Sequence, residues 1–598
     1  MTQYQSRDDV PLNEKWNLQD IYSSIDEWNE DYRAAEKLNT ELKTFDGNIK
    51  NGEELYDYLY RSEELTSRFH KLSVYAMLQI DEDTRVSSSQ VLQNRVTQLG
   101  VKITAARSFF HPFLLSLQEE TLEGYIKEVK ELEYFERDLL ESYRYRDHVL
   151  SKEQEEVISQ FGEALSSPGK TFGLLNNADI KFGKVTNEDG SKIELTRGMY
   201  SKLLEDKDRT KRKEAFKSYF LPYVQLKNTI ASTLTSAVKN NATTSKLRNY
   251  SSSLEKALFP DLVPKAVYEN LIQTARDHLH PLHQYMTIRK NALGLEKLRQ
   301  YDLRVPLLSE ARQTISFDDA YMLMLKGLAP LGEEYVSRLK EIKDKRYIDI
   351  RETPGKRSGA YNCGLYGIHP FVLLNHQDDL NSLFTLVHEM GHCMHSLYSS
   401  ENQPRISAGY SIFVAEVAST VNEVLLIHYL LKHTDQESIR KQLLNQYIDQ
   451  FRGIFFTQVM FAEFEKWMHE MIEGGESLTA ESLCQKYKNL YQAYNGTELT
   501  LDEEVQYAWA QIPHFYRPFY VYKYATGYIS AIYIADRLLQ DDQEMLTNYL
   551  EFLKSGSSDY PLALLKKAGV DLEKPEPFEK ALGTFAEIVD EFEEAVLN

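Results

Sequence analysis

Hydrophobic and polar residues recur with a helical period along most of the chain. Between about residues 26 and 166, apolar residues lie three and four positions apart, as in SEELTSRFHKLSVYAMLQ and LQNRVTQLGVKITAARSFFHPFLLSL. This spacing gives each helix one apolar face, and it predicts antiparallel helices packed side by side. The period resumes from about residue 197 to 345, so we expect a mainly α fold.

The first interruption of this pattern lies at residues 166–182, SSPGKTFGLLNNADIKF, which are rich in Gly, Pro, Ser and Asn and predict a break. The chain then alternates on both sides of Asn187 to Gly190, which predicts a β-hairpin with an Asp-Gly turn. We expect a domain junction here, with a helical N-terminal domain over 1–195 and a second domain over 196–598.

A second change of pattern covers residues 346–375, where glycine mixes with short β-branched and aromatic runs. It predicts the strands and loops of a small sheet. Further along, Thr434 and Glu437 have the spacing of a capping box. That signal predicts the start of a long helix, which ends at the glycine pair Gly474–Gly475.

Composition and charge exclude several classes of protein. The 598 residues carry 90 acidic and 69 basic side chains, a formal net charge of -21, which argues against a nucleic-acid partner because binding to phosphates needs a basic surface. The three cysteines are too few for a disulfide framework and suit a reducing compartment. We also see neither a signal peptide nor an apolar run of about 18 residues, and therefore expect a cytoplasmic protein without a membrane partner.

The stretch LFTLVHEMGHCMHSLYSS, residues 383–400, places polar groups inside an otherwise apolar helix. His388 and His392 are four residues apart, so their imidazoles share one helical face and can converge on a metal ion. Glu389 follows His388 directly, and its carboxylate can reach a water held by that metal and act as a general base. The sequence thus predicts a catalytic metal site.

A catalytic zinc needs a third protein ligand, and two residues compete for this role. His395 continues the face, but residues 388, 392 and 395 extend along roughly 10 Å of helix axis and cannot all reach one ion. The apolar segment SAGYSIFVAEVASTVNEVLLIHYLL supplies Glu416 from a second helix. We expect Glu416 to be the third ligand, which leaves a fourth position open for water.

Three further residues near these ligands are candidates for orienting them. Glu423 lies seven residues after Glu416 on the same helical face, and together with Ser419 and His395 it can accept an imidazole N–H or fix a carboxylate. The competing interpretations are a capped or satisfied structural histidine for His395 and a solvated helix face for Glu423. Gly391 costs helix stability, and a close approach of the second helix would explain it.

The HExxH pattern, followed 24 residues later by Glu416 in FVAEVASTVNE, resembles the thimet-oligopeptidase family of zinc peptidases, and within it the bacterial oligoendopeptidase F branch. The segments KRSGAYNCG, HPFVLLN, IPHFYRPFYVYKYATG and WNLQDIY are similar to segments of that branch. The resemblance covers nearly the whole chain. It implies a zincin-like metallopeptidase with a deep substrate channel, one Zn²⁺ per chain and hydrolysis of short peptides.

The same resemblance implies roles for the segment PHFYRPFYVYKYATGY. In the family a histidine and tyrosines of this segment hold the oxyanion that develops during amide hydrolysis, and these roles carry over to His514, Tyr522 and Tyr524. The spacing of residues in this segment differs from that of eukaryotic members of the family. The sequence therefore leaves open which of the tyrosines stabilises the oxyanion. Tyr520 is a candidate for contact with substrate, and a structural aromatic cluster is the competing interpretation.

The glycine-rich segment SGAYNCGLYG predicts a substrate strand. Its glycines fit an edge where another backbone approaches closely, so a peptide can pair along Gly359, Ala360 and Tyr361 with its carbonyl toward the metal. A connector that touches nothing is the competing interpretation.

Two other functions compete with a zinc endopeptidase. A zinc exopeptidase, either a carboxypeptidase or a peptidyl-dipeptidase, would need a cation for the terminal carboxylate, and Arg517 and Lys523 are candidates. A non-catalytic helical scaffold that binds peptides is the more distant alternative, because such a protein has no need of Glu389 beside the ligands.

Overall fold

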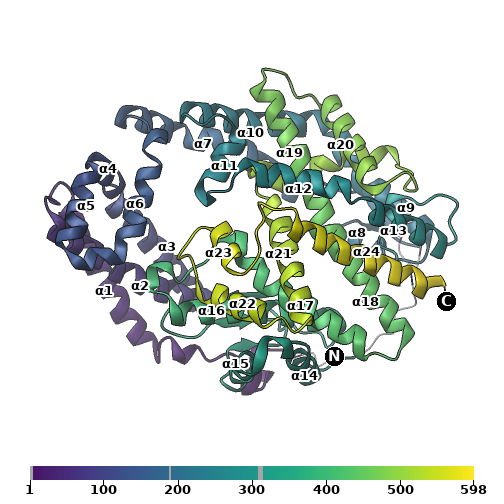
Figure 1. Ribbon diagram of the computed structural model, residues 1–598, viewed down its shortest axis with the longest axis horizontal. Coiled ribbons are helices and arrows are strands. Elements are labelled where there is room, and N and C mark those ends of the chain that lie inside the picture. The colour runs from purple at the N-terminus through teal and green to yellow at the C-terminus, as the bar shows by residue number, and fades with distance from the viewer. Residues whose placement is uncertain (1–3, 187–189, 308–313, 598) are drawn as a thin grey trace. The chain divides into compact units, whose positions relative to one another are not determined.

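The computed structural model describes residues 4–186, 190–307 and 314–597. Helices dominate it and strands are few (Figure 1), which confirms the mainly α prediction. The first helices are α1 (Ile25–Leu42), α2 (Gly52–Glu82), α3 (Ser87–Arg107), α4 (Phe110–Ser116), α5 (Glu119–Glu128), α6 (Glu136–Arg144) and α7 (Lys152–Leu174). They are followed by α8 (Arg197–Leu203), α9 (Arg209–Gln225), α10 (Lys227–Leu247), α11 (Ser253–Leu258), α12 (Lys265–Asp277), α13 (His280–Ala292), α14 (Phe317–Gly327) and α15 (Gly332–Asp344). The last are α16 (Leu380–Asn402), α17 (Ile412–His433), α18 (Glu437–Gln450), α19 (Thr457–Glu473), α20 (Ala480–Asn495), α21 (Tyr522–Leu539), α22 (Gln543–Lys554), α23 (Pro561–Lys567) and α24 (Glu576–Leu597).

The chain forms two compact units, each assembled from three separate stretches. The first unit comprises residues 1–149, 313–426 and 537–559, and the second comprises 150–312, 427–536 and 560–598. Both units thus contain parts of the N-terminal and the C-terminal half of the chain. The domain boundary expected after residue 195 stays a prediction.

Helices α1 to α3 of the first unit form the side-by-side arrangement predicted from their period. The side chain of Ser24 caps α1, and that of Asn51 caps α2 by accepting a hydrogen bond from the N–H of Glu54 at 2.9 Å. Trp28 of α1 is fully buried and its ring stacks on Tyr32. The apolar faces of these helices therefore meet in a common core.

The first unit also contains a three-stranded sheet of β3 (Ile348–Asp349), β4 (Tyr361–Cys363) and β5 (Phe371–Leu373), in the order β3-β5-β4. Strand β5 is central and pairs parallel with β3 and antiparallel with β4. Strand β4 is therefore an edge strand, as predicted for this segment. It packs on α16, which also contacts α22 from far along the chain (Figure 1).

Buried charges fix strand β3 within the first unit. The Lys356 ammonium, whose side chain is fully buried, lies 2.7 Å from Asp349 Oδ1, and Arg7 donates 2.6 Å bonds to both Asp349 Oδ2 and Glu82 Oε1. The guanidinium of Arg7 thereby joins the N-terminal segment to both α2 and β3.

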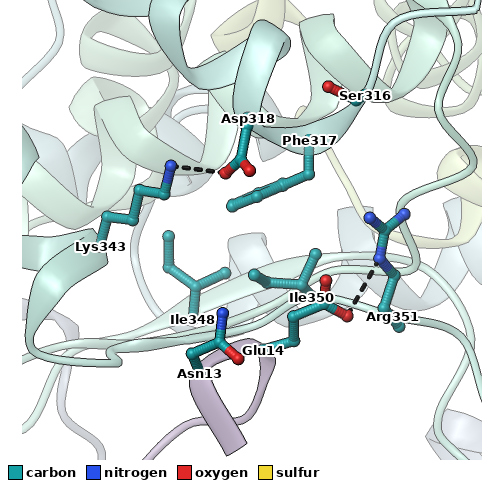
Figure 2. A pocket seen from close by; sticks show the side chains of 9 residues that line it. All are labelled: Asn13, Glu14, Ser316, Phe317, Asp318, Lys343, Ile348, Ile350 and Arg351. Carbon is teal, nitrogen blue, oxygen red and sulfur yellow. Dashed lines mark hydrogen bonds and ion pairs between the residues drawn. The ribbon is translucent and has the colours of Figure 1, made fainter. Parts of the chain in front are cut away.

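A small cavity lies beside the same strand (Figure 2). It is lined by Asn13, Glu14, Ser316, Phe317, Asp318, Lys343, Ile348, Ile350 and Arg351. Two ion pairs lie among these residues, Lys343 with Asp318 at 2.7 Å and Arg351 with Glu14 at 3.3 Å, and Ile348 and Ile350 are part of its apolar lining. Because its charged side chains neutralise one another in pairs, we interpret this cavity as a structural feature and not as a binding site.

Two predictions about the second unit differ in outcome. The hairpin is confirmed, because β1 (Lys184–Thr186) and β2 (Lys192–Glu194) pair antiparallel; residues 187–189 of its turn lie outside the described residues. The break predicted for residues 166–182 lies later in that stretch than Pro168, since α7 continues through this proline to Leu174 and a π-helical turn follows at Leu175–Asp179. Asn240 of α10 donates a 2.9 Å hydrogen bond to the carbonyl of Leu165, in the turn where proline weakens the helix.

The capping box predicted at Thr434 is wrong. Helix α18 begins at Glu437 with Gln436 as its N-cap, and no side chain caps it. The predicted end is confirmed, since Gly474 is the C-cap of α19. Between α18 and α19 a π-helical turn at Phe451–Phe456 maintains a continuous helical path.

Candidate metal centre

Helix α16 carries the HExxH residues and is fixed at its start. The side chain of Asp379 caps it by accepting a 2.8 Å hydrogen bond from the N–H of Ser382. Its apolar residues are almost all buried. The imidazoles of His388 and His392 project from one face, as the four-residue spacing predicts.

The first part of α17 packs directly on α16, and Gly391 permits this contact. A Cβ atom at Gly391 would lie 2.5 Å from Ser419 Cα and 2.6 Å from the carbonyl oxygen of Ala418. No real Cβ tolerates such backbone distances. The close approach of a second helix expected from this glycine is confirmed.

This packing brings His388, His392 and Glu416 together, with donor atoms all within 4.8 Å of one another. His388 Nε2 lies 3.1 Å from His392 Nε2 and 3.5 Å from Glu416 Oε2, and His392 Nε2 lies 3.6 Å from the same oxygen. Tetrahedral coordination at about 2.0–2.1 Å requires ligand atoms about 3.3–3.4 Å apart. The three donors fit the edges of such a tetrahedron.

The hydrogen bonds of the two imidazoles also fit a cation. His388 Nδ1 lies 2.6 Å from Glu423 Oε1, so its N–H is donated to that carboxylate, and His392 bonds to the backbone of Ala415. When both imidazoles are neutral, each Nε2 atom carries a lone pair, and the two atoms lie 3.1 Å apart. These lone pairs would repel each other alone, and a metal ion bound between them would remove this repulsion.

Glu389 is buried on the same helix, and its pKa is shifted from the usual value. Burial and the charge of Glu416 raise its pKa to about 7, whereas His388 and a hydrogen bond from the backbone N–H of Asn362 lower it. Among the described residues, Glu389 Oε2 has no hydrogen-bond partner. A carboxyl group whose pKa lies near neutrality suits general acid and base catalysis.

Two of the three candidate orienting residues contact ligands. Besides the bond from His388 to Glu423, Ser419 Oγ lies 3.1 Å from Glu416 Oε2 and donates a 3.0 Å hydrogen bond to the carbonyl of Glu416. His395 lies apart from the ligands and stacks on Tyr410, with ring centroids 3.8 Å apart. Burial lowers the pKa of His395 to about 3, so this imidazole is neutral.

The residues predicted to bind substrate lie at and before the edge strand β4. Gly359 is exposed and has φ +86°, a backbone conformation that favours glycine. Tyr361 is anchored by a 2.7 Å hydrogen bond to Asp81 of α2. The free edge at Asn362 faces Glu389, since its N–H bonds to that carboxylate.

Three polar residues in contact with this site were not predicted. Asn362, Ser396 and Tyr410 are joined by hydrogen bonds between β4, α16 and the segment before α17. One signal in the sequence could have indicated Ser396, because it follows His392 by four residues and lies on the same face.

The predicted oxyanion donors lie in the second unit, where three of the aromatic rings cluster. The ring of His514 lies 6.2 Å from that of Tyr520 and 6.1 Å from that of Tyr524. Tyr522 is two residues from Tyr524 on α21 and projects from another face, where it is buried against Tyr268. The structure thus groups His514, Tyr520 and Tyr524, and separates Tyr522 from them.

Helix α17 is long and apolar enough to cross a membrane, but 72% of its apolar window is buried inside the protein. It carries Glu416 and Glu423, which contact the histidines of α16. We therefore interpret its apolar character as that of a core helix.

Comparisons with known proteins agree with this geometry. Residues 202–584 match the family described as Peptidase family M3, and residues 114–182 match the one described as Oligopeptidase F. The chain is 40% identical over 597 residues to Oligopeptidase PepF of Bacillus subtilis, covering 100% of this chain and 89% of that relative. It is 38% identical over 593 residues to an Oligoendopeptidase F homolog of Lactococcus lactis subsp. lactis, covering 99% and 98%. The crystal structure of oligoendopeptidase-F from Enterococcus faecium matches with a TM-score of 0.75 and 35% identity, over 96% of this chain and 99% of that one.

Proposed function

The chain belongs to peptidase family M3, and on that premise we propose that it is a zinc endopeptidase that hydrolyses internal bonds of short peptides. The resemblance drawn from the HExxH segment is confirmed, and the chain is a metallo-oligopeptidase. The observation that carries the finer proposal is the set of three donor atoms, His388 Nε2, His392 Nε2 and Glu416 Oε2, spaced as the edges of a tetrahedron. The deep substrate channel implied by the resemblance stays a prediction.

His388, His392 and Glu416 would hold one zinc ion, which when bound supplies Lewis acidity toward water and a peptide carbonyl. Glu389 takes a proton from the attacking water as the water oxygen bonds to the carbonyl carbon. As the C–N bond breaks, Glu389 gives this proton to the departing amine nitrogen. Its unpartnered Oε2 and raised pKa support this double role.

We assign the stabilisation of the developing oxyanion to His514 and Tyr524, whose rings cluster with that of Tyr520. A donor of this kind is worth about 3–4 kcal/mol of transition-state stabilisation. The buried position of Tyr522 favours Tyr524 over it, and Tyr520 is left for contact with substrate. Gly359, Ala360 and Tyr361 would pair with the extended peptide.

The exopeptidase alternative is weakened by one ion pair. Lys523 lies 2.6 Å from Asp261, and both side chains are mostly buried, so its charge is already neutralised. Arg517, held 4.2 Å over the ring of Tyr520, is the remaining candidate cation. Cleavage of internally quenched peptides blocked at both ends would exclude a strict exopeptidase.

The test of the proposal separates the base from the ligands. Glu389→Gln should retain zinc and lose nearly all turnover, whereas His392→Ala should lose zinc as well. More than a few percent of the wild-type rate in Glu389→Gln, at unchanged zinc content, would exclude Glu389 as the base. Absence of chelator-sensitive hydrolysis in the wild-type protein would favour the peptide-binding scaffold instead.

The cytoplasm is the compartment that we propose. All three cysteines are free, and Cys393 and Cys484 are buried. Unpaired thiols are typical of reducing compartments.

A further inference from the structure

Ser396 occupies a junction between the metal-binding helix and the edge strand. Its hydroxyl accepts a 2.9 Å hydrogen bond from the side-chain amide of Asn362 on β4 and lies 2.9 Å from the hydroxyl of Tyr410. We propose that Ser396 is a positioning residue, which fixes β4 against α16 so that the strand supports Glu389 and receives the peptide in register.

The hydrogen bonds at this junction have one consistent direction. Tyr410 donates its O–H to the carbonyl of His392 at 3.3 Å, so it can only accept from Ser396. Ser396 therefore donates to Tyr410 while it accepts from Asn362. The hydrogen bonds thus run from the side chain of Asn362 through Ser396 and Tyr410 to the backbone carbonyl of His392, a candidate metal ligand.

Because of this arrangement, Ser396 does not make the hydrogen bond that a serine inside a helix usually makes. Such a residue commonly donates to the carbonyl four residues earlier, which here is that of His392. Tyr410 bonds to that carbonyl instead, and stacking on His395 holds its ring in place. The Ser396 hydroxyl can therefore bridge to the strand.

The bridge between Ser396 and β4 matters because its strand residue, Asn362, also bonds to Glu389. Asn362 binds Ser396 through its side chain and Glu389 through its backbone N–H. Contact between the elements is also close at Gly364, where a Cβ would lie 3.1 Å from Ser396 Cβ. Loss of the bridge would let β4 shift relative to Glu389, and misplacement by about 1 Å can cost roughly 100-fold in rate.

This inference rests on the proposed function, and the first experiment uses Ser396→Ala with Ser399→Ala as its matched control. Ser399 is a fully buried serine on the same helix, but its hydroxyl bonds to the carbonyl of Ala408 and not to β4. We expect Ser396→Ala to lower kcat/KM on a blocked peptide at least about tenfold, with KM raised severalfold and zinc content unchanged. Ser399→Ala should change kcat/KM less than about threefold. Equal effects of the two variants would overturn the proposal.

A double-mutant cycle then tests the link to Asn362. Asn362→Ala should match Ser396→Ala, and the double variant should be no worse than either, because both remove the same bridge. Multiplied losses in the double variant would overturn the proposal.

Hydrogen–deuterium exchange gives a measurement independent of catalysis. The backbone amides of β4 should exchange faster in Ser396→Ala than in Ser399→Ala, while those of α1 to α3 stay unchanged. Unchanged β4 exchange would overturn the proposal even if activity fell. Failure of the wild-type protein to hydrolyse peptides would instead remove the proposed function and leave the exchange result standing.

Discussion

His388 donates its Nδ1–H to Glu423 Oε1 at 2.6 Å, so a carboxylate from α17 fixes the orientation of an imidazole on α16. In the neutral imidazole the same bond places the proton on Nδ1, so the lone pair is on Nε2, which is directed toward His392 and Glu416. Glu423 lies seven residues after Glu416, two helical turns further along the same face. One face of α17 therefore supplies both a ligand and the group that orients another ligand.

Replacing Glu423 should weaken metal binding without removing a ligand. We expect Glu423→Ala to lower zinc affinity about 10–100-fold, since outer partners of ligating histidines typically contribute that much. Competition with a chromophoric chelator measures the affinity. Glu401→Ala, which removes a surface pair with Arg338 at the end of α16, serves as control. Equal zinc affinities in the two variants would argue against an orienting role for Glu423.

Gly391 should not tolerate a methyl group, even though alanine favours a helix. Gly391→Ala gains up to about 1 kcal/mol of helix propensity, but its Cβ would meet the backbone of Ser419 at 2.5 Å. We expect a net loss of about 1–3 kcal/mol from overpacking, together with weaker zinc binding because α16 and α17 must separate. Gly124→Ala on α5, where a Cβ meets nothing within 4 Å, should be neutral or stabilising. Thermal melting of both variants tests the contrast.

Much of the metal centre could be predicted because its signals are local. The step from His388 to His392 is one helical turn, and Glu416 stands out as an acid in an apolar segment. The junction of Ser396 with Asn362 could not be predicted, because it joins residues 34 positions apart whose contact depends on how β4 meets α16. Local polarity alone does not reveal such a partner.

The same distinction explains the errors in the fold. Proline and glycine at 168 and 169 predict a helix end, yet a side chain from α10 bonds to the carbonyl of Leu165 and the helix continues. Thr434 and Glu437 have the spacing of a capping box, yet α18 begins only at Glu437. Around Pro168 a tertiary contact accompanies the continued helix, and at Thr434 the local spacing alone does not set the helix start.

The charged cluster at β3 should be essential for the first unit. Asp349→Ala leaves the Lys356 ammonium buried without its carboxylate and removes a partner of Arg7. Breaking a buried pair in this way costs about 3–5 kcal/mol. The control is Asp318→Ala beside the cavity of Figure 2, where the carboxylate that pairs with Lys343 is 79% exposed and should contribute at most about 1 kcal/mol. Urea unfolding followed by circular dichroism measures both, and similar midpoints for the two variants would contradict the assignment.

We predict that the stability of the folded protein depends on pH through Glu465, a fully buried acid in the second unit. It accepts a 2.7 Å hydrogen bond from the N–H of Phe519, which has φ +52° in the segment of the oxyanion candidates. Burial raises the pKa of Glu465 to about 8, and the bond from Phe519 lowers it. Burial lowers the pKa of the adjacent His469 and raises the pKa of Tyr268.

The folded state therefore holds a proton on Glu465 at pH values where the unfolded chain has released it. Between a pKa of about 4.5 in the unfolded chain and about 8 in the folded state, the contribution of this group falls by about 1.4 kcal/mol per pH unit, and it levels off above that range. Glu465→Gln keeps the acceptor for Phe519 but cannot ionise, so it should lack this slope. We expect the variant to gain thermal stability relative to the wild type from pH 5 to pH 8.5. Melting curves at pH 5, 7 and 8.5 test this, and a constant difference across the three would show that Glu465 does not hold its proton in the folded state.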